Sequence, residues 1–67
     1  MNEFLQFIEQ RRVIKGMYKS TLCEGIISVS SYNRYLKGKD IPIEVVNGLL
    51  NKLGLKLAIA IDNIERL

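Results

Sequence analysis

Residues 18–39, YKSTLCEGIISVSSYNRYLKGK, contain two short apolar segments joined by a turn that carries a serine. Apolar side chains recur at helical spacing in both segments: Leu22, Cys23 and Ile26 in the first, and Val29, Tyr32, Tyr35 and Leu36 in the second. Ser28 precedes the second segment, where its side chain can accept a hydrogen bond from a backbone N–H one turn inside a helix. Gly38 follows that segment, where a residue with left-handed backbone angles ends a helix. The pattern therefore predicts a helix-turn-helix with its two helices at about 19–26 and 29–37.

Helices are also expected on both sides of this motif, because helices of about nine residues are unstable in water unless they pack on neighbours. Residues 3–15 carry apolar side chains at helical spacing, and so do residues 43–53, which follow Pro42. Gly25 falls inside the first motif helix, which predicts a close approach between the two motif helices. The sequence thus predicts a single, mainly all-α domain of four or five helices over residues 1–67.

The tail LKLAIAID, residues 55–62, has a different period. Its large apolar side chains occupy every second position: Leu55, Leu57, Ile59 and Ile61. A period of two is typical of a half-buried strand, and we favour that interpretation. Because no other stretch predicts a strand, the tail is expected to pair with the same strand of a second copy and to form a dimer interface. The alternative is a fifth helix, favoured by the two alanines, in which one stripe contains Leu57, Ile61, Ile64 and Leu67.

The composition argues against an enzyme. The chain has no histidine, a single cysteine and no glycine-rich phosphate loop, so no catalytic residue, metal site or cofactor is predicted. Cys23 lies on the inner face of its predicted helix and is interpreted as a small buried side chain. Nothing resembles a secretory signal, and no apolar run is long enough to span a membrane. We therefore expect a cytoplasmic protein.

Positive charge is concentrated in the middle of the chain. Residues 11–39 contain seven basic residues and one acid, a net charge of +6, whereas the rest of the chain carries −3, which together give the overall +3. A basic segment that contains a helix-turn-helix is expected where the motif faces a polyanion.

The run LCEGIISVSSYNRYLKGK, residues 22–39, resembles the helix-turn-helix of the Cro/repressor (xenobiotic-response-element) family, and the resemblance covers roughly Leu5 to Leu57. The turn serine, Arg34 and Gly38 fall at the family's spacing, and the likeness is closest to the N-terminal DNA-binding domain of Gram-positive peptide-sensing regulators. Two residues depart from the family pattern: Leu36 stands where Glu is usual, and Lys19 stands where Gln or Glu is usual. This chain has no counterpart of the long helical-repeat domain of the peptide sensors, so peptide sensing is not expected.

The resemblance implies a bacterial or phage regulator of transcription, a repressor that binds double-stranded DNA by inserting the second motif helix into the major groove. By family position, the residues implied to read bases are Val29, Ser30, Asn33 and Arg34. Arg34 suits a bidentate contact to guanine, Asn33 a contact to adenine, and Val29 a contact to the methyl group of thymine. The residues implied to bind phosphates, which fix position without reading sequence, are Lys19, Ser31, Lys37 and Lys39.

A homodimer on an inverted-repeat operator is expected, because a single small helix-turn-helix offers only a modest interface with DNA. The tail is also similar to the strand that follows the helices in some antitoxins, so the antitoxin half of a toxin–antitoxin pair, with a toxin as partner, is one alternative. A helical protein-interaction module that does not bind DNA is another, because Leu36 replaces an acidic residue and Val29 occupies a reading position.

Overall fold

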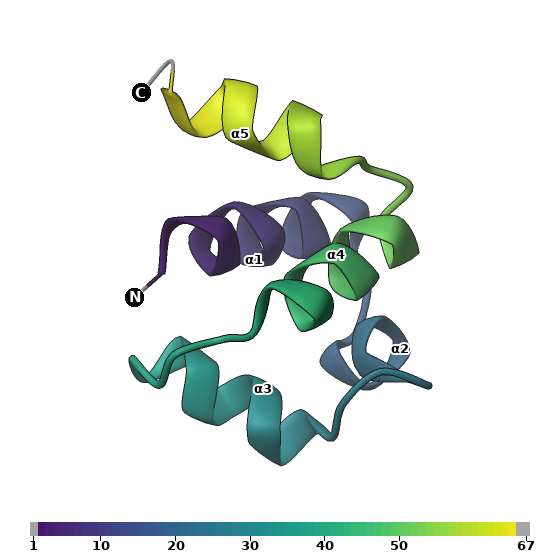
Figure 1. Ribbon diagram of the computed structural model, residues 1–67. Helices are drawn as coiled ribbons and strands as arrows, with labels where there is room; N and C mark the ends of the chain where they lie inside the picture. Colours follow the sequence, from purple (N-terminus) through teal and green to yellow (C-terminus); the bar gives the residue numbers. More distant parts are fainter. Residues whose placement is uncertain (1, 66–67) are drawn as a thin grey trace.

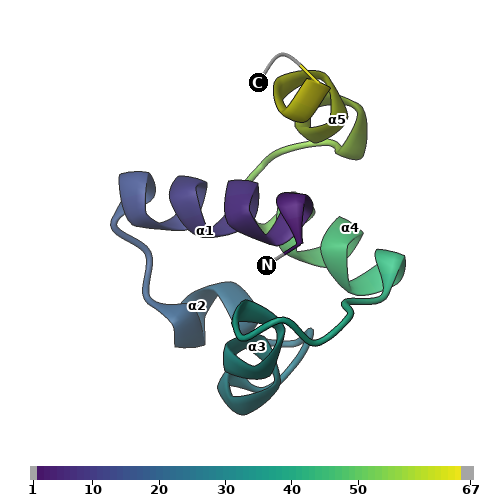
Figure 2. The same cartoon turned by 90° about the vertical axis from the view of Figure 1, so that its left-hand side faces the viewer.

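Five helices make up the part of the chain that the computed structural model describes, residues 2–65, and no strand occurs within those residues. The helices are α1 (Glu3–Lys15), α2 (Lys19–Cys23), α3 (Val29–Leu36), α4 (Ile43–Lys52) and α5 (Leu57–Glu65). In both Figure 1 and Figure 2, α1 lies in the middle of the molecule, with α5 on one side and the α2–α3 pair on the other. α4 packs against α1, α2 and α5. The predicted all-α class is confirmed.

Capping residues fix the ends of several helices. At the start of α1 the Asn2 side chain accepts a hydrogen bond from a backbone N–H at 2.8 Å, and Gly16 ends the helix with a φ of 68°. At the start of α3 the Ser28 hydroxyl accepts a hydrogen bond from the Ser31 N–H at 3.1 Å, as predicted. Pro42 directly precedes α4. The starts of α3 and α4 thus follow the sequence predictions, because the signals of Ser28 and Pro42 are local.

One hydrophobic core joins the five helices. Its buried members are Leu5, Phe7, Ile8, Leu22, Cys23, Tyr32, Val46, Leu49, Leu50, Leu53 and Ala60. Tyr32 is the largest fully buried side chain and holds α3 against the rest of the molecule. Cys23 is buried as predicted, and its burial raises the pKa of the thiol above the ordinary value. None of the helices within residues 2–65 has the length and apolar character that a membrane crossing requires.

The first motif helix is shorter than predicted. α2 ends at Cys23, and Gly25 lies in the turn that follows, with a φ of 78°. A Cβ at Gly25 would meet no atom within 4 Å, so this glycine serves the backbone of the turn and not a contact between helices. The close approach occurs instead at Gly48 of α4, where a Cβ would lie 3.4 Å from the side chain of Ile26.

The predicted C-terminal strand is wrong, because residues Leu57–Glu65 form α5, which packs on α1 and α4. Ala60 is completely buried whereas Ala58 is exposed, although a strand would place both on the same face. Leu57, Ala60 and Ile64 recur at three and four residues and pack toward the core. The residues fit both periods, and packing against α1 decides in favour of the helix that was the alternative.

Candidate nucleic-acid interface

One side of α3 is turned away from the core. Ser30, Arg34 and Lys37 are exposed, and their spacing of four and three residues places them on one side of the helix and at its end. Val29 and Asn33 are half-buried beside them. Figures 1 and 2 show α3 at the edge of the molecule, on the far side of α1 from α5. The four predicted base-reading residues are thus all on α3, two of them exposed and two on its flanks.

Hydrogen bonds between side chains organise the first turn of α3. Ser28 Oγ donates to Ser31 Oγ at 3.0 Å, in addition to accepting from the Ser31 backbone. Arg34 Nη2 donates to the same Ser31 Oγ at 3.3 Å, which occupies one of the five N–H donors of its guanidinium group. Ser31, a predicted phosphate contact, therefore lies beside Arg34, a predicted base reader, and restrains it.

Lys19 and Asn33 meet although they belong to different helices. Lys19 is the first residue of α2, and its Nζ donates to Asn33 Oδ1 at 2.9 Å. Both residues are half-buried. An ammonium group has donors only, so the carbonyl oxygen of the amide must be the atom that faces it. Sequence reasoning gave these residues separate roles, a phosphate contact and a base contact, and did not predict that they touch.

Behind α3, the hydroxyl of buried Tyr32 binds a charged pair on α1. Tyr32 Oη donates to Glu9 Oε1 at 2.9 Å, and Arg12 binds the same carboxylate through Nε at 2.7 Å and Nη2 at 2.8 Å. Arg12 Nη1 also donates to the carbonyl oxygen of Met17, beyond the end of α1. The network fixes the position of α3 relative to α1 and to the segment that leads into α2. This role of Glu9 is not predicted from the sequence. The available signal was Arg12, a charged residue on an apolar helix face, three residues after the acid that it binds.

These contacts shift the pKa values of the groups involved. Hydrogen bonds from Arg12, with a smaller contribution from the Tyr32 hydroxyl, lower the pKa of Glu9 below its ordinary value of 4.5, although partial burial opposes the shift. Burial and the neighbouring Glu9 carboxylate raise the pKa of Tyr32 well above its ordinary value. At neutral pH, Glu9 is therefore the charged acceptor and Tyr32 the neutral donor.

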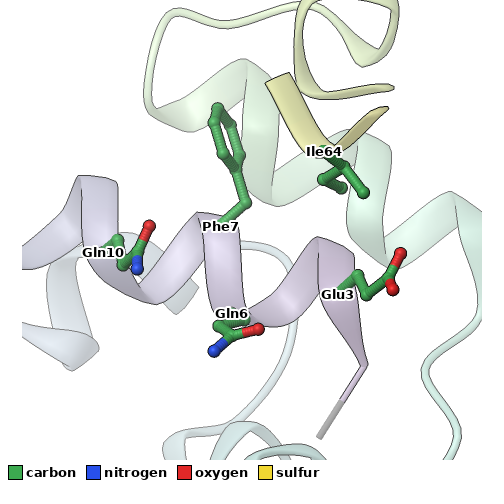
Figure 3. Close-up of a pocket in the computed structure, with 5 residues that line it drawn as sticks. All are labelled: Glu3, Gln6, Phe7, Gln10 and Ile64. Carbon is green, nitrogen blue, oxygen red and sulfur yellow. The ribbon is translucent and has the colours of Figure 1, made fainter. Parts of the chain in front are cut away.

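The basic residues of the middle segment do not all surround α3. Lys37 and Lys39 are exposed at the end of α3 and just after it. Arg11, in contrast, lies over the ring of Phe7, with 5.1 Å between the guanidinium carbon and the ring centre. Phe7 lines a cavity between α1 and α5 together with Ile64 (Figure 3), so Arg11 belongs to the opposite side of α1. The positive charge near α3 is smaller than the sequence count implies.

The cavity between α1 and α5 has a volume of about 250 Å³ and is lined by Glu3, Gln6, Phe7, Gln10 and Ile64 (Figure 3). Its polar side chains, two carboxamides and one carboxylate, all come from α1. They include one acid, Glu3, and no second acid beside it. Within residues 2–65, no group of three or more His, Cys, Asp or Glu side chains could hold a metal ion.

The four predicted dimerisation residues separate into two pairs. Leu55 and Leu57 are partly buried and pack against the core, whereas Ile59 and Ile61 of α5 are 46% and 39% exposed. Leu67, the last member of the stripe in the fifth-helix alternative, lies outside residues 2–65. Half of the predicted interface is therefore used within the chain, and half of it faces outward.

Comparison with known proteins gave no match: no family model, no curated protein and no solved structure matches this chain. The likeness of residues 22–39 to the Cro/repressor family stays a prediction. The geometry of α3 and its surroundings is accordingly the basis for a function.

Proposed function

We propose that this chain is a sequence-specific regulator of transcription that binds double-stranded DNA through a repressor-like helix-turn-helix formed by α2 and α3. The observation that carries the proposal is the division of α3 into two sides. Ser30 and Arg34 are exposed on one side, and Tyr32 is completely buried on the other. In a helix-turn-helix the second helix enters the major groove with its N-terminal residues against the base edges. A helix of eight residues, capped at its start and anchored from behind, suits that task.

The exposed residues of α3 fit distinct roles in such a complex. Arg34 matches the N7 and O6 acceptors of guanine with its planar set of donors, and Ser30 lies one turn earlier on the same side. Val29 lies at the start of the helix, where its methyl groups suit the methyl group of thymine. Lys37 and Lys39 extend the same surface at the far end of α3 and suit phosphates, which position the protein without reading sequence.

We also propose that the regulator acts in the cytoplasm as a homodimer on an inverted repeat. A single module of this size offers a small DNA interface, which two copies would double. Ile59 and Ile61 are exposed on α5, on the far side of α1 from α3. Pairing through α5 would leave both copies of α3 open to DNA. Two major-groove contacts one helical turn apart require a separation of about 34 Å between the two recognition helices.

The salt dependence of DNA binding tests the proposed function. Affinity for a labelled random duplex, followed by fluorescence anisotropy, should fall about a hundredfold between about 50 and about 200 mM salt if about four phosphates are neutralised. Lys37→Ala should weaken this binding and reduce the slope of the salt dependence. Lys56→Ala is the matched control, because Lys56 is an exposed lysine next to α5. Affinity that is absent, or that does not change with salt, would contradict the proposal.

A second candidate function is a helical protein-interaction module without DNA binding. Val13 and Ile14 in the last turn of α1 are 60% and 74% exposed, and they line an open apolar hollow with Glu9 and Gln10. A toxin or another regulatory protein would cover such side chains. The same salt titration separates the two functions, because an interaction module should show no salt-dependent affinity for duplex DNA.

A further inference from the structure

The contact between Lys19 and Asn33 restricts what Asn33 can offer to a base. Lys19 Nζ donates to Asn33 Oδ1 at 2.9 Å, and both side chains are half-buried between α2 and α3. Asn33 precedes Arg34 and is one turn after Ser30 on α3, so its amide borders the exposed side of the helix. The Lys19 ammonium uses one of the two lone pairs of the carbonyl oxygen and places a positive charge beside it, so the amide nitrogen is the better group for an outside partner.

The position of Lys19 supports a specific role for this contact. Lys19 is the first residue of α2, where the unpaired N–H groups at the helix start disfavour a positive charge. Helix formation therefore does not explain a lysine at this position. Its hydrogen bond to Asn33 Oδ1 joins the two motif helices at the edge of the proposed DNA-binding surface.

Adenine and guanine differ in the hydrogen-bonding groups that they present to such a pair in the major groove. The bidentate contact of asparagine with adenine requires the carbonyl oxygen to accept from N6–H and the amide nitrogen to donate to N7. Lys19 already donates to that oxygen and places a positive charge beside it, which would repel the amino group of adenine. Guanine presents two acceptors, N7 and O6, which can receive one donor from the Asn33 amide and one from the Lys19 ammonium.

We propose that Lys19 and Asn33 form a reading unit of donors only, which selects guanine over adenine at one position of each half-site. This inference rests on the proposed DNA-binding function, and it replaces the adenine contact that the sequence predicts for Asn33. Lys19 acts partly through Asn33, as a positioning residue for its amide, and partly through its own remaining N–H donors.

The test is the base preference of the wild type and of Lys19→Met, which keeps the side-chain length and removes the donors. Selection of binding sites from random duplexes identifies the operator, and affinities are then measured for the operator and for its guanine-to-adenine variants. At the base pair that Lys19 and Asn33 read, identified as the one whose preference changes in Lys19→Met, the wild type should favour guanine over adenine by about tenfold, as expected for a good base contact. Lys19→Met frees the Asn33 carbonyl, so it should abolish or reverse that preference. Lys37→Met removes the same charge elsewhere on the surface. It should lower the affinities for the guanine and the adenine duplex by the same factor and leave their ratio unchanged.

A second variant checks that Asn33 reads the same base pair. Asn33→Ala should reduce the preference at the position that Lys19→Met affects, and the double variant should lose less discrimination than the sum of the two single losses, because the two residues act as one unit. If Lys19→Met does not give the wild-type circular dichroism spectrum, Lys19→Leu, which also lacks a hydrogen-bond donor, takes its place with the same expectation. The inference is overturned if the wild type prefers adenine there, or if the lysine variant lowers both affinities by one factor. Absence of binding to any duplex would instead overturn the proposed function, and this inference with it.

Discussion

Tyr32 links the hydrophobic core to the charged pair of Glu9 and Arg12, and a single atom makes the connection. Tyr32→Phe removes the hydroxyl and leaves the buried ring in place. Hydrogen bonds to charged groups contribute about 1.5–3 kcal/mol, and the partial exposure of Glu9 reduces this, so we expect a loss of about 1–2 kcal/mol in the free energy of unfolding. Urea denaturation measures it. Tyr35→Phe is the matched control, because Tyr35 is half-buried on the same helix, and equal losses in the two variants would contradict the role of the hydroxyl.

The lowered pKa of Glu9 predicts a pH dependence of stability. A carboxylate whose pKa is lower in the folded state stabilises the fold above its ordinary pKa of 4.5, and this contribution is lost as the pH falls through the folded value. Glu9→Gln removes the titrating group. The difference in unfolding free energy between wild type and Glu9→Gln should therefore be largest at neutral pH and should shrink below about pH 4.5. A difference that stays constant from neutral to acid pH would show that Glu9 does not contribute in this way.

At the scale of the helices, α5 is the element for which the strand and the helix interpretations of the sequence differ most clearly. Ala60 is completely buried in the core and Ala58 is exposed, whereas a strand would place both on one face. Ala60→Leu should lower the free energy of unfolding by about 1–3 kcal/mol through overpacking. Ala58→Leu, the same change on the outer side of α5, should have little effect. Equal effects of the two substitutions in a denaturation experiment would contradict the helical register.

Local signals in the sequence located most of the helices, and contacts distant in sequence could not be predicted. Ser28 caps α3, and Gly16 ends α1, because each acts on the backbone next to it. The tail is ambiguous because apolar residues at every second position include pairs four apart, and Ala60 and Ile64 add pairs three apart with Leu57 and Ile61. The Lys19–Asn33 contact spans 14 residues of sequence, and it depends on how the two helices pack. No spacing rule within one helix contains that information.

At the scale of the whole molecule, α5 and α3 lie on opposite sides of α1, so a dimer contact through α5 would leave α3 uncovered (Figure 1). Sedimentation of the wild type at micromolar concentration should show a dimer. Ile59→Lys and Ile61→Lys should give monomers with an unchanged circular dichroism spectrum, because these side chains are exposed on α5. Ile43→Lys, at a side chain 50% exposed on α4, is the control and should remain dimeric. A monomeric wild type would rule out the α5-mediated dimer.

Reading of the major groove by α3 can be measured through the affinity of Arg34→Ala for the selected operator and for a random duplex. Arg34 is exposed, so its removal should leave the fold intact and take away about 1–3 kcal/mol of discrimination at one base pair. If Arg34 reads a base, the variant should lose much of its affinity for the operator and little of its affinity for the random duplex. Equal losses for both duplexes, or a wild type that binds the operator no more tightly than the random duplex, would contradict reading of the major groove by α3.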